Sequence, residues 1–185
     1  MSRFSSPINI PNILTLVRIL LTPVFVILLL RQLYPHALAV FIFAGISDGL
    51  DGFIARYFNQ RTALGAYLDP TADKLLLVSS YLALSVLQVI PAWVAVVVIT
   101  RDVIIVVGIA IVTLFEKAYE VRPTLLSKCT TTLQILLVAV SLFDPNHSRL
   151  AALHTPLLWT TAGLTVLSGL HYIYIGMSIL QEQGE

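Results

Sequence analysis

Long runs of apolar residues, interrupted at proline, glycine and clusters of charge, are the main pattern of this chain. A helix that crosses a membrane needs about 20 mostly apolar residues, and the interruptions divide the sequence into six segments of that order. The runs 75–89 and 93–99 lack the strict alternation that a barrel strand would need. The pattern therefore predicts an all-α protein, a bundle of six transmembrane helices. The predicted segments are 11–31, 35–58, 68–89, 91–116, 124–143 and 154–180.

The six segments leave little of the chain for any other domain. We expect residues 1–10 to form an N-terminal cytoplasmic or interfacial segment, 11–180 to form one six-helix domain, and 181–185 to form a cytoplasmic tail. The start of the chain has no short apolar run with a small-residue cleavage site, so an uncleaved first span fits better than a signal peptide.

The composition excludes several classes of protein. Of the 185 residues, 57% are hydrophobic and only 11% are charged, whereas an ordinary soluble domain has about 25% charged residues. So little charge cannot cover a water-facing surface, which excludes a soluble enzyme and a disordered chain. The net charge is +1, from 11 basic and 10 acidic residues. The chain therefore has no overall positive electrostatic field that would attract a nucleic acid. We expect a polytopic membrane protein.

Basic residues near the segment ends predict the orientation. With the N-terminus inside, most of them fall in the inner loops, and this bias favours the cytoplasmic side for both termini. We therefore expect an integral protein of a bacterial cytoplasmic membrane. The inner basic residues are Arg3, Arg56, Arg61, Lys117, Arg122 and Lys128, and the outer ones are Arg31 and Arg149.

Two pairs of aspartates inside the second and third segments are the main candidate functional residues. Asp48 and Asp51 are three residues apart, and Asp69 and Asp73 are four apart, so each pair lies on one face of a helix. Two neighbouring antiparallel helices can bring the four carboxylates together. Because such charges repel strongly at low dielectric, a cation must lie between them. Ligands that are all oxygen suit Mg²⁺ or Mn²⁺ better than zinc.

Small and basic residues surround these aspartates. Gly52 and Ala55 continue the face of the first pair, so a flat group can rest against the helix there. Arg56 and Arg61 follow at the predicted membrane surface, where a guanidinium group suits phosphate oxygens.

These residues together form a recognisable motif, Asp48-x-x-Asp51-Gly52-x-x-Ala55-Arg56, eight residues, then Gly65-x-x-x-Asp69-x-x-x-Asp73. The motif resembles the signature of the CDP-alcohol phosphatidyltransferase family, with every defining position filled. The resemblance extends from about residue 9 to residue 174. Asn12, Thr15 and Arg18 resemble the opening of the glycerophosphate branch. The stretches 60–74, 101–102 and 123–128 resemble the phosphatidylglycerophosphate synthases and the CMP-forming cardiolipin synthases.

The resemblance implies both a fold and an activity. Family members are six-helix membrane enzymes, usually homodimers, that transfer a phosphatidyl group from CDP-diacylglycerol to an alcohol and release CMP. It further implies two divalent cations, Mg²⁺ or Mn²⁺, among the motif aspartates. Asp48, Asp51 and Asp69 would ligate metal, and Asp73 would contact the second metal and act as the base. The CDP pocket would be lined by Gly52, Ala55, Arg56 and Gly65.

The acceptor alcohol is predicted to carry a phosphate. Arg101, Arg122 and Lys128 are basic residues that suit an anionic headgroup, and both glycerol-3-phosphate and phosphatidylglycerol qualify. We rank glycerol-3-phosphate first. The phosphatidylglycerophosphate synthases usually have Arg-Glu where this chain has Arg101-Asp102, which favours the cardiolipin type as the alternative. The remaining candidates for acceptor or phosphate binding are Thr15, Arg18 and Arg61.

Each of these features also has a simpler interpretation. Asp69-Pro70 alone could be an ordinary helix start, with Asp as the N-cap. Arg101 and Asp102 could be a pair that neutralises itself, and Arg18 could extend to the membrane surface. A divalent-cation transporter would also bury aspartates between helices, but it would often show a second cluster in the other half of the chain. Residues 103–180 contain no such cluster.

Overall fold

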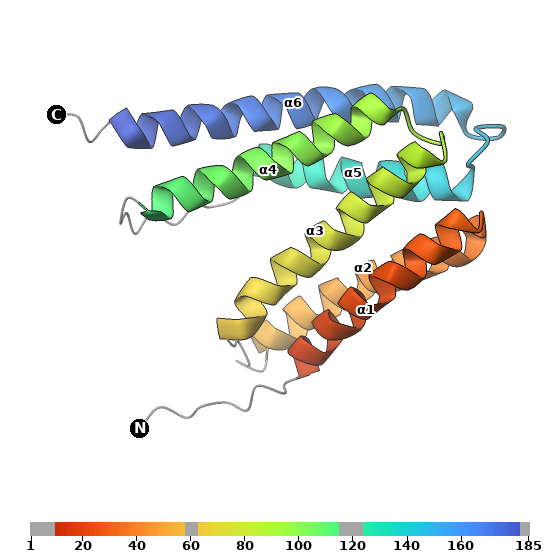
Figure 1. The fold of residues 1–185 in the computed structure, drawn as a ribbon, viewed down its shortest axis with the longest axis horizontal. Helices are drawn as coiled ribbons and strands as arrows, with labels where there is room; N and C mark the ends of the chain where they lie inside the picture. Colours follow the sequence, from red (N-terminus) through yellow and green to blue (C-terminus); the bar gives the residue numbers. More distant parts are fainter. Residues whose placement is uncertain (1–9, 58–62, 115–123, 182–185) are drawn as a thin grey trace. The chain divides into compact units, whose positions relative to one another are not determined.

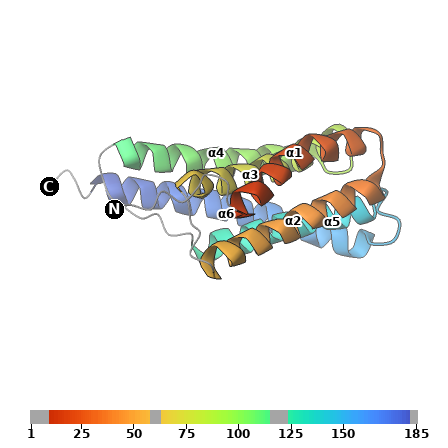
Figure 2. The ribbon, with the colours of Figure 1, turned by 90° about the horizontal axis from the view of Figure 1, so that it is seen from below.

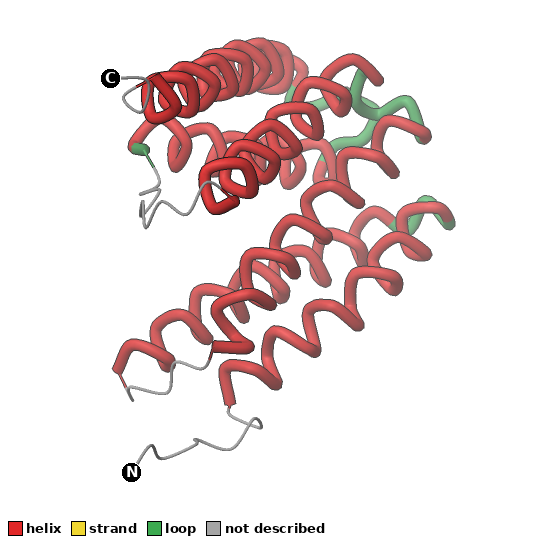
Figure 3. The backbone as a smooth tube through the Cα atoms, turned by 60° about the vertical axis from the view of Figure 1, so that its left-hand side comes forward, coloured by secondary structure: helices red, strands yellow, loops and turns green. Residues whose placement is uncertain are grey.

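The computed structural model describes residues 10–57, 63–114 and 124–181, and regular structure in these ranges is entirely helical (Figures 1 and 3). The predicted all-α class is therefore confirmed. The helices are α1 (Ile10–Leu30), α2 (Tyr34–Tyr57), α3 (Ala63–Val86), α4 (Ala92–Leu114), α5 (Leu125–Phe143) and α6 (Ala151–Gln181).

The start of α3 differs most from the sequence prediction. The helix begins at Ala63, five residues before the predicted start, so Asp69 and Pro70 lie inside it. The interpretation of Asp69-Pro70 as a helix start is therefore wrong. Proline lacks the backbone donor of a helix interior, but membrane helices tolerate it because neighbouring groups satisfy the freed carbonyl.

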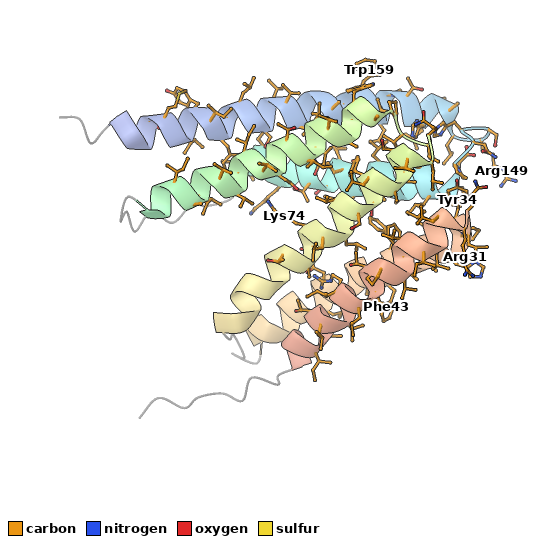
Figure 4. The ribbon with its side chains drawn as sticks, in the orientation of Figure 1. Arg31, Tyr34, Phe43, Lys74, Arg149 and Trp159 are labelled. Carbon is orange, nitrogen blue, oxygen red and sulfur yellow. The ribbon has the colours of Figure 1, made fainter. Side chains whose placement is uncertain are left out.

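Among the residues whose side chains the structure describes, three helices have both the length and the composition of a membrane span. These stretches are Ile13–Leu30 in α1, Ala92–Ile111 in α4 and Leu125–Phe143 in α5, and α2 contains a shorter apolar stretch, Tyr34–Leu50. Helices α2, α3 and α6 have 24, 24 and 31 residues, and α2 and α3 carry the aspartate motif. Large apolar side chains such as Phe43 and Trp159, 56% and 64% exposed, project outward (Figure 4), as expected of helices in contact with lipid.

The described helices form two compact units, and α1, α2 and α3 belong to the first (Met1–Leu87). Within this unit α1 packs against both α2 and α3. The contact between α1 and α2 is apolar: Phe25 and Leu29 are fully buried, and the ring of Phe25 lies 5.9 Å from that of Phe41, centroid to centroid. Helix α1 is therefore the element through which this unit is held together.

The turn from α1 to α2 has a residue in the left-handed conformation. Gln32 has φ 57°, its N–H donates to the carbonyl of Leu29 at 2.7 Å, and the N–H of Leu33 donates to that of Leu28 at 2.9 Å. This pair of bonds closes a helix C-terminus, and glycine is the usual residue at the left-handed position.

Replacing Gln32 by glycine is expected to stabilise the protein. A side chain in the left-handed conformation costs about 1–2 kcal/mol, part of which is offset by the greater freedom of glycine in the unfolded chain. We expect a net gain of about 0.5–1 kcal/mol, seen as a higher midpoint of thermal unfolding in detergent. Gln32→Ala is the control, because alanine keeps the strained Cβ. An equal gain in both variants would contradict this explanation.

The second unit (Gln88–Glu185) contains α4, α5 and α6, with α6 packed against both of the others. Figure 2 shows these helices from below. Val94 and Val98 of α4 and Leu137 of α5 are fully buried. The indole rings of Trp93 and Trp159 lie 5.2 Å apart and join α4 to α6.

A single carboxylate organises the connection from α5 to α6. Asp144 Oδ1 accepts from the N–H and the hydroxyl of Ser148 at 3.2 and 3.1 Å, and Oδ2 accepts from the N–H groups of Arg149 and Leu150 at 2.7 and 2.8 Å. These hydrogen bonds, that from Leu150 most of all, lower the pKa of Asp144 to about 2, so the carboxylate is charged at any physiological pH. Figure 4 labels Arg149 in this connection.

Candidate active site

One arginine of α1 joins two of the predicted aspartates. Arg18 Nη1 donates to Asp48 Oδ1 of α2 at 2.5 Å and to Asp73 Oδ1 of α3 at 2.7 Å. Asp48 and Asp73, from the second and third predicted segments, thus bind the same arginine nitrogen. They meet through α1, because α1 is the helix that packs against both α2 and α3.

The three side chains differ sharply in exposure. Arg18 is 1% exposed, whereas the side chains of Asp48 and Asp73 are 38% and 50% exposed. The interpretation of Arg18 as a side chain that reaches the membrane surface is therefore wrong, since its charge is paired inside the unit. Thr15, one turn earlier, is also fully buried, and the hydroxyl of Thr22 donates to the carbonyl of Arg18 at 3.0 Å.

The other residues of the aspartate motif have side chains outside the described part of the chain. Asp51, Gly52, Ala55 and Arg56 belong to the end of α2, and Gly65 and Asp69 to the start of α3. Arg61 and Arg122 lie outside the described residues. Among the side chains that the structure describes, no three Asp, Glu, His or Cys residues gather as a metal site. Only two of the four motif aspartates belong to that part of the chain.

The charges of this cluster fit a further cation. Two carboxylates face one guanidinium, so these three groups together carry a net negative charge. Both acids offer oxygen atoms, the ligands that Mg²⁺ and Mn²⁺ prefer, and both are partly exposed. The donor chemistry of Asp48 and Asp73 therefore fits a divalent metal.

A second buried ion pair lies in the other unit, around Arg101 of α4. Arg101 Nη1 donates to Asp102 Oδ1 at 2.8 Å, Nη2 to Ser127 Oγ of α5 at 2.5 Å, and Nε to Ser168 Oγ of α6 at 3.3 Å. The arginine and the aspartate are 6% and 9% exposed, and the guanidinium carbon lies 5.9 Å from the ring centre of Tyr172. The self-neutralising pair that the sequence left open is therefore formed. Its hydrogen bonds join all three helices of the unit.

A row of buried polar groups that was not predicted from the sequence lies between α5 and α6. Gln134 Nε2 donates to Thr165 Oγ1 at 3.1 Å, and Thr130 Oγ1 donates to the carbonyl of Leu164 at 3.3 Å. Hydroxyl side chains at helical spacing on both segments were the signal that could have revealed it. The buried polar residues of the row are Thr130, Gln134, Ser141, His154, Thr161, Thr165 and Ser168.

Lys128, a predicted acceptor residue, is exposed on the first turn of α5.

Comparison with known proteins establishes the class to which the chain belongs. The model of the CDP-alcohol phosphatidyltransferase family matches residues 8–167. This range contains the whole aspartate motif and five of the six helices in full, so the chain belongs to the CDP-alcohol phosphatidyltransferase family. Members of this family generally use a divalent metal, in agreement with the donor chemistry of the cluster. Together with the apolar helices, family membership makes the chain an integral membrane protein.

Relatives within the family carry two kinds of name. The chain is 36% identical to a rat protein named cardiolipin synthase (CMP-forming), over 97% of this chain and 65% of the relative. It is 33% identical to the Bacillus subtilis CDP-diacylglycerol–glycerol-3-phosphate 3-phosphatidyltransferase, over 89% of this chain and 93% of the relative. A Mycobacterium tuberculosis protein named probable phosphatidylglycerophosphate synthase is 34% identical over 89% of this chain and 80% of the relative. The chain thus spans just under two thirds of the length of the rat protein.

Proposed function

We propose that this protein transfers a phosphatidyl group from CDP-diacylglycerol to an alcohol acceptor and releases CMP. The observation that carries the proposal is the meeting of Asp48 and Asp73, from two different helices, at one cationic atom. It supports the proposal because these two acids come from the two halves of the family motif, and a metal-dependent transfer of this kind requires acids of both halves to lie close together. Family membership supplies the reaction class.

Each motif residue has a role in this proposal. Asp48, Asp51 and Asp69 would hold two divalent cations, Mg²⁺ or Mn²⁺, with Asp73 as a further ligand of the second. When bound, the cations would supply positive charge that offsets the diphosphate oxygens, so that a hydroxyl can approach. Gly52, Ala55, Arg56 and Gly65 line the CDP pocket.

The role of Asp73 follows from the chemistry of the acceptor. The acceptor hydroxyl has a high pKa, and it becomes a better nucleophile when a positioned carboxylate takes its proton. Asp73 is half exposed, so an acceptor can reach its oxygens. The hydroxyl oxygen then attacks the lipid-side phosphorus in line, the bond from this phosphorus to the bridging oxygen breaks, and CMP leaves with the electron pair.

The proposed acceptor is glycerol-3-phosphate, and phosphatidylglycerol is the second candidate. The first is supported by the match to the Bacillus subtilis transferase, which extends over 93% of that protein. The second is favoured by Arg101-Asp102 in place of Arg-Glu and by the 36% identity to the rat cardiolipin synthase. Lys128, with Arg61 and Arg122, is proposed to bind the acceptor phosphate. Arg101 remains a candidate although its donors already bind protein groups.

The membrane arrangement completes the proposal. All six helices have at least 19 residues, long enough to span a hydrocarbon core, and we assign them to one six-span domain over 11–180. The distribution of basic residues supports cytoplasmic termini and a cytoplasmic active site. A homodimer in a bacterial inner membrane is part of the same proposal.

The proposal is tested by measuring CMP release from CDP-diacylglycerol by the purified protein with Mg²⁺ or Mn²⁺. The acceptors offered are glycerol-3-phosphate, phosphatidylglycerol, inositol and serine. We expect metal-dependent release with glycerol-3-phosphate. Release with phosphatidylglycerol alone would assign the cardiolipin reaction. Cation flux into vesicles without any CMP release would contradict the proposal and support a transporter.

A further inference from the structure

We propose that Arg18 is an internal cation that competes with divalent metal for Asp48 and Asp73, and so sets the metal concentration at which the site fills. This inference rests on the proposed function, because it takes these aspartates as metal ligands. The proposed function gives Arg18 no role in metal binding, and this inference adds one.

The hydrogen-bond geometry supports competition between Arg18 and a metal ion for the same carboxylate oxygens. A single nitrogen, Nη1, binds Oδ1 of both acids at 2.5 and 2.7 Å, so the guanidinium lies where a bridging cation would also bind. A guanidinium group keeps its charge at any accessible pH. Because a carboxylate oxygen held by a charged donor is a poorer ligand for a second cation, Arg18 has to leave the two oxygens before they can ligate metal fully.

The position of Arg18 explains why this competition has a measurable cost. The side chain is 1% exposed, so leaving the acids has a free-energy cost, because the guanidinium must either find another partner or move towards water. A buried charge needs a partner. The anionic diphosphate of the lipid substrate is the group of matching chemistry, so metal and substrate binding should each favour release of Arg18 from the acids.

The test is the affinity for Mn²⁺ without substrate, measured by electron paramagnetic resonance on the detergent-solubilised full chain. Arg18→Gln should bind Mn²⁺ about tenfold more tightly than wild type, a coupling of ordinary size between two ligands. Arg18→Lys, which keeps a cation at the site, should remain within about threefold of wild type. Arg31→Gln controls for net charge, because Arg31 lies at the far end of α1 (Figure 4), and it should leave the affinity unchanged.

A measurement on the unaltered protein covers the case in which Arg18→Gln does not fold. Phenylglyoxal modifies accessible arginines, and mass spectrometry reports each site. Mn²⁺ should increase the modification of Arg18 several-fold and leave that of Arg31 unchanged. Modification of Arg18 that stays constant or falls with Mn²⁺ would overturn the competition.

The outcomes separate this inference from the proposed function. If wild type binds Mn²⁺, Asp48→Asn weakens that binding and Arg18→Gln does not tighten it, the competition is wrong and the metal site stands. If neither wild type nor any Arg18 variant binds Mn²⁺ in a way that depends on Asp48, both the metal site and the competition are wrong. Tighter binding in Arg18→Gln together with unchanged binding in Arg31→Gln supports both.

Discussion

Asp73→Asn is expected to lower the rate of CMP release by about 10²–10⁴-fold, the usual contribution of a positioned general base. Asparagine has nearly the shape of aspartate, and its carbonyl oxygen can still accept from Arg18 Nη1, which binds Asp73 at 2.7 Å in the wild type. The contact between α1 and α3 is therefore kept while the proton acceptor is removed. We expect the variant to bind CDP with an affinity close to that of wild type, as measured by calorimetry.

The control for this loss lies on the same helix. Leu75 is 44% exposed on α3, and Leu75→Ala should retain most of the activity because it removes only exposed apolar surface. Turnover of Asp73→Asn at the wild-type rate would remove the base assignment. Loss of both turnover and CDP binding would instead assign Asp73 to substrate binding.

Asp102→Asn is expected to destabilise the protein by about 3–5 kcal/mol, because it leaves the buried charge of Arg101 without its counter-charge. Arg101 and Asp102 are both nearly inaccessible, at 6% and 9% exposure, and their nitrogen and oxygen lie 2.8 Å apart. The arginine also donates to Ser127 and Ser168, so a shift of its guanidinium would disturb the contacts of α4 with both neighbours. The measurement is equilibrium unfolding in detergent.

The double variant Arg101→Met with Asp102→Leu is the informative control. Replacing a buried ion pair by apolar residues of similar size is often neutral for stability, so the double variant should recover most of the loss. Once it is stable, its KM for the acceptor tests the role proposed for Arg101 in binding. A KM that is raised while stability is normal supports that role, and an unchanged KM assigns Arg101 to structure alone.

The sequence predicted the helices well because their signal is local. Apolar runs and the breaks between them are enough to place α1 and α2 within one residue of the observed bounds. The error at α3 came from Asp69-Pro70, a pair that marks a helix start in water-soluble proteins. In this chain α3 begins earlier, at Ala63, and runs through Asp69 and Pro70 without interruption.

The partners of the charged residues could not be predicted in the same way. The spacing within the two aspartate pairs indicated that a cation was needed, but spacing within a helix does not show that α1 packs against both helices and brings Arg18 to Asp48 and Asp73. The partners of Arg101 and Asp102 could not be predicted from the sequence either. Residues next to each other do not share a helix face, and the serines that complete the cluster come from segments 26 and 67 residues away.

The length of α6 has a consequence for the fit of the protein to its membrane. Its 31 residues rise about 46 Å, whereas the 19 residues of α5 rise about 28 Å, close to the thickness of a hydrocarbon core. In the proposed six-span arrangement, the excess has to be accommodated by tilt or by projection into the headgroup layer. In that arrangement α6 is the element most sensitive to hydrophobic mismatch, and lipids of different acyl length should act on this protein through it.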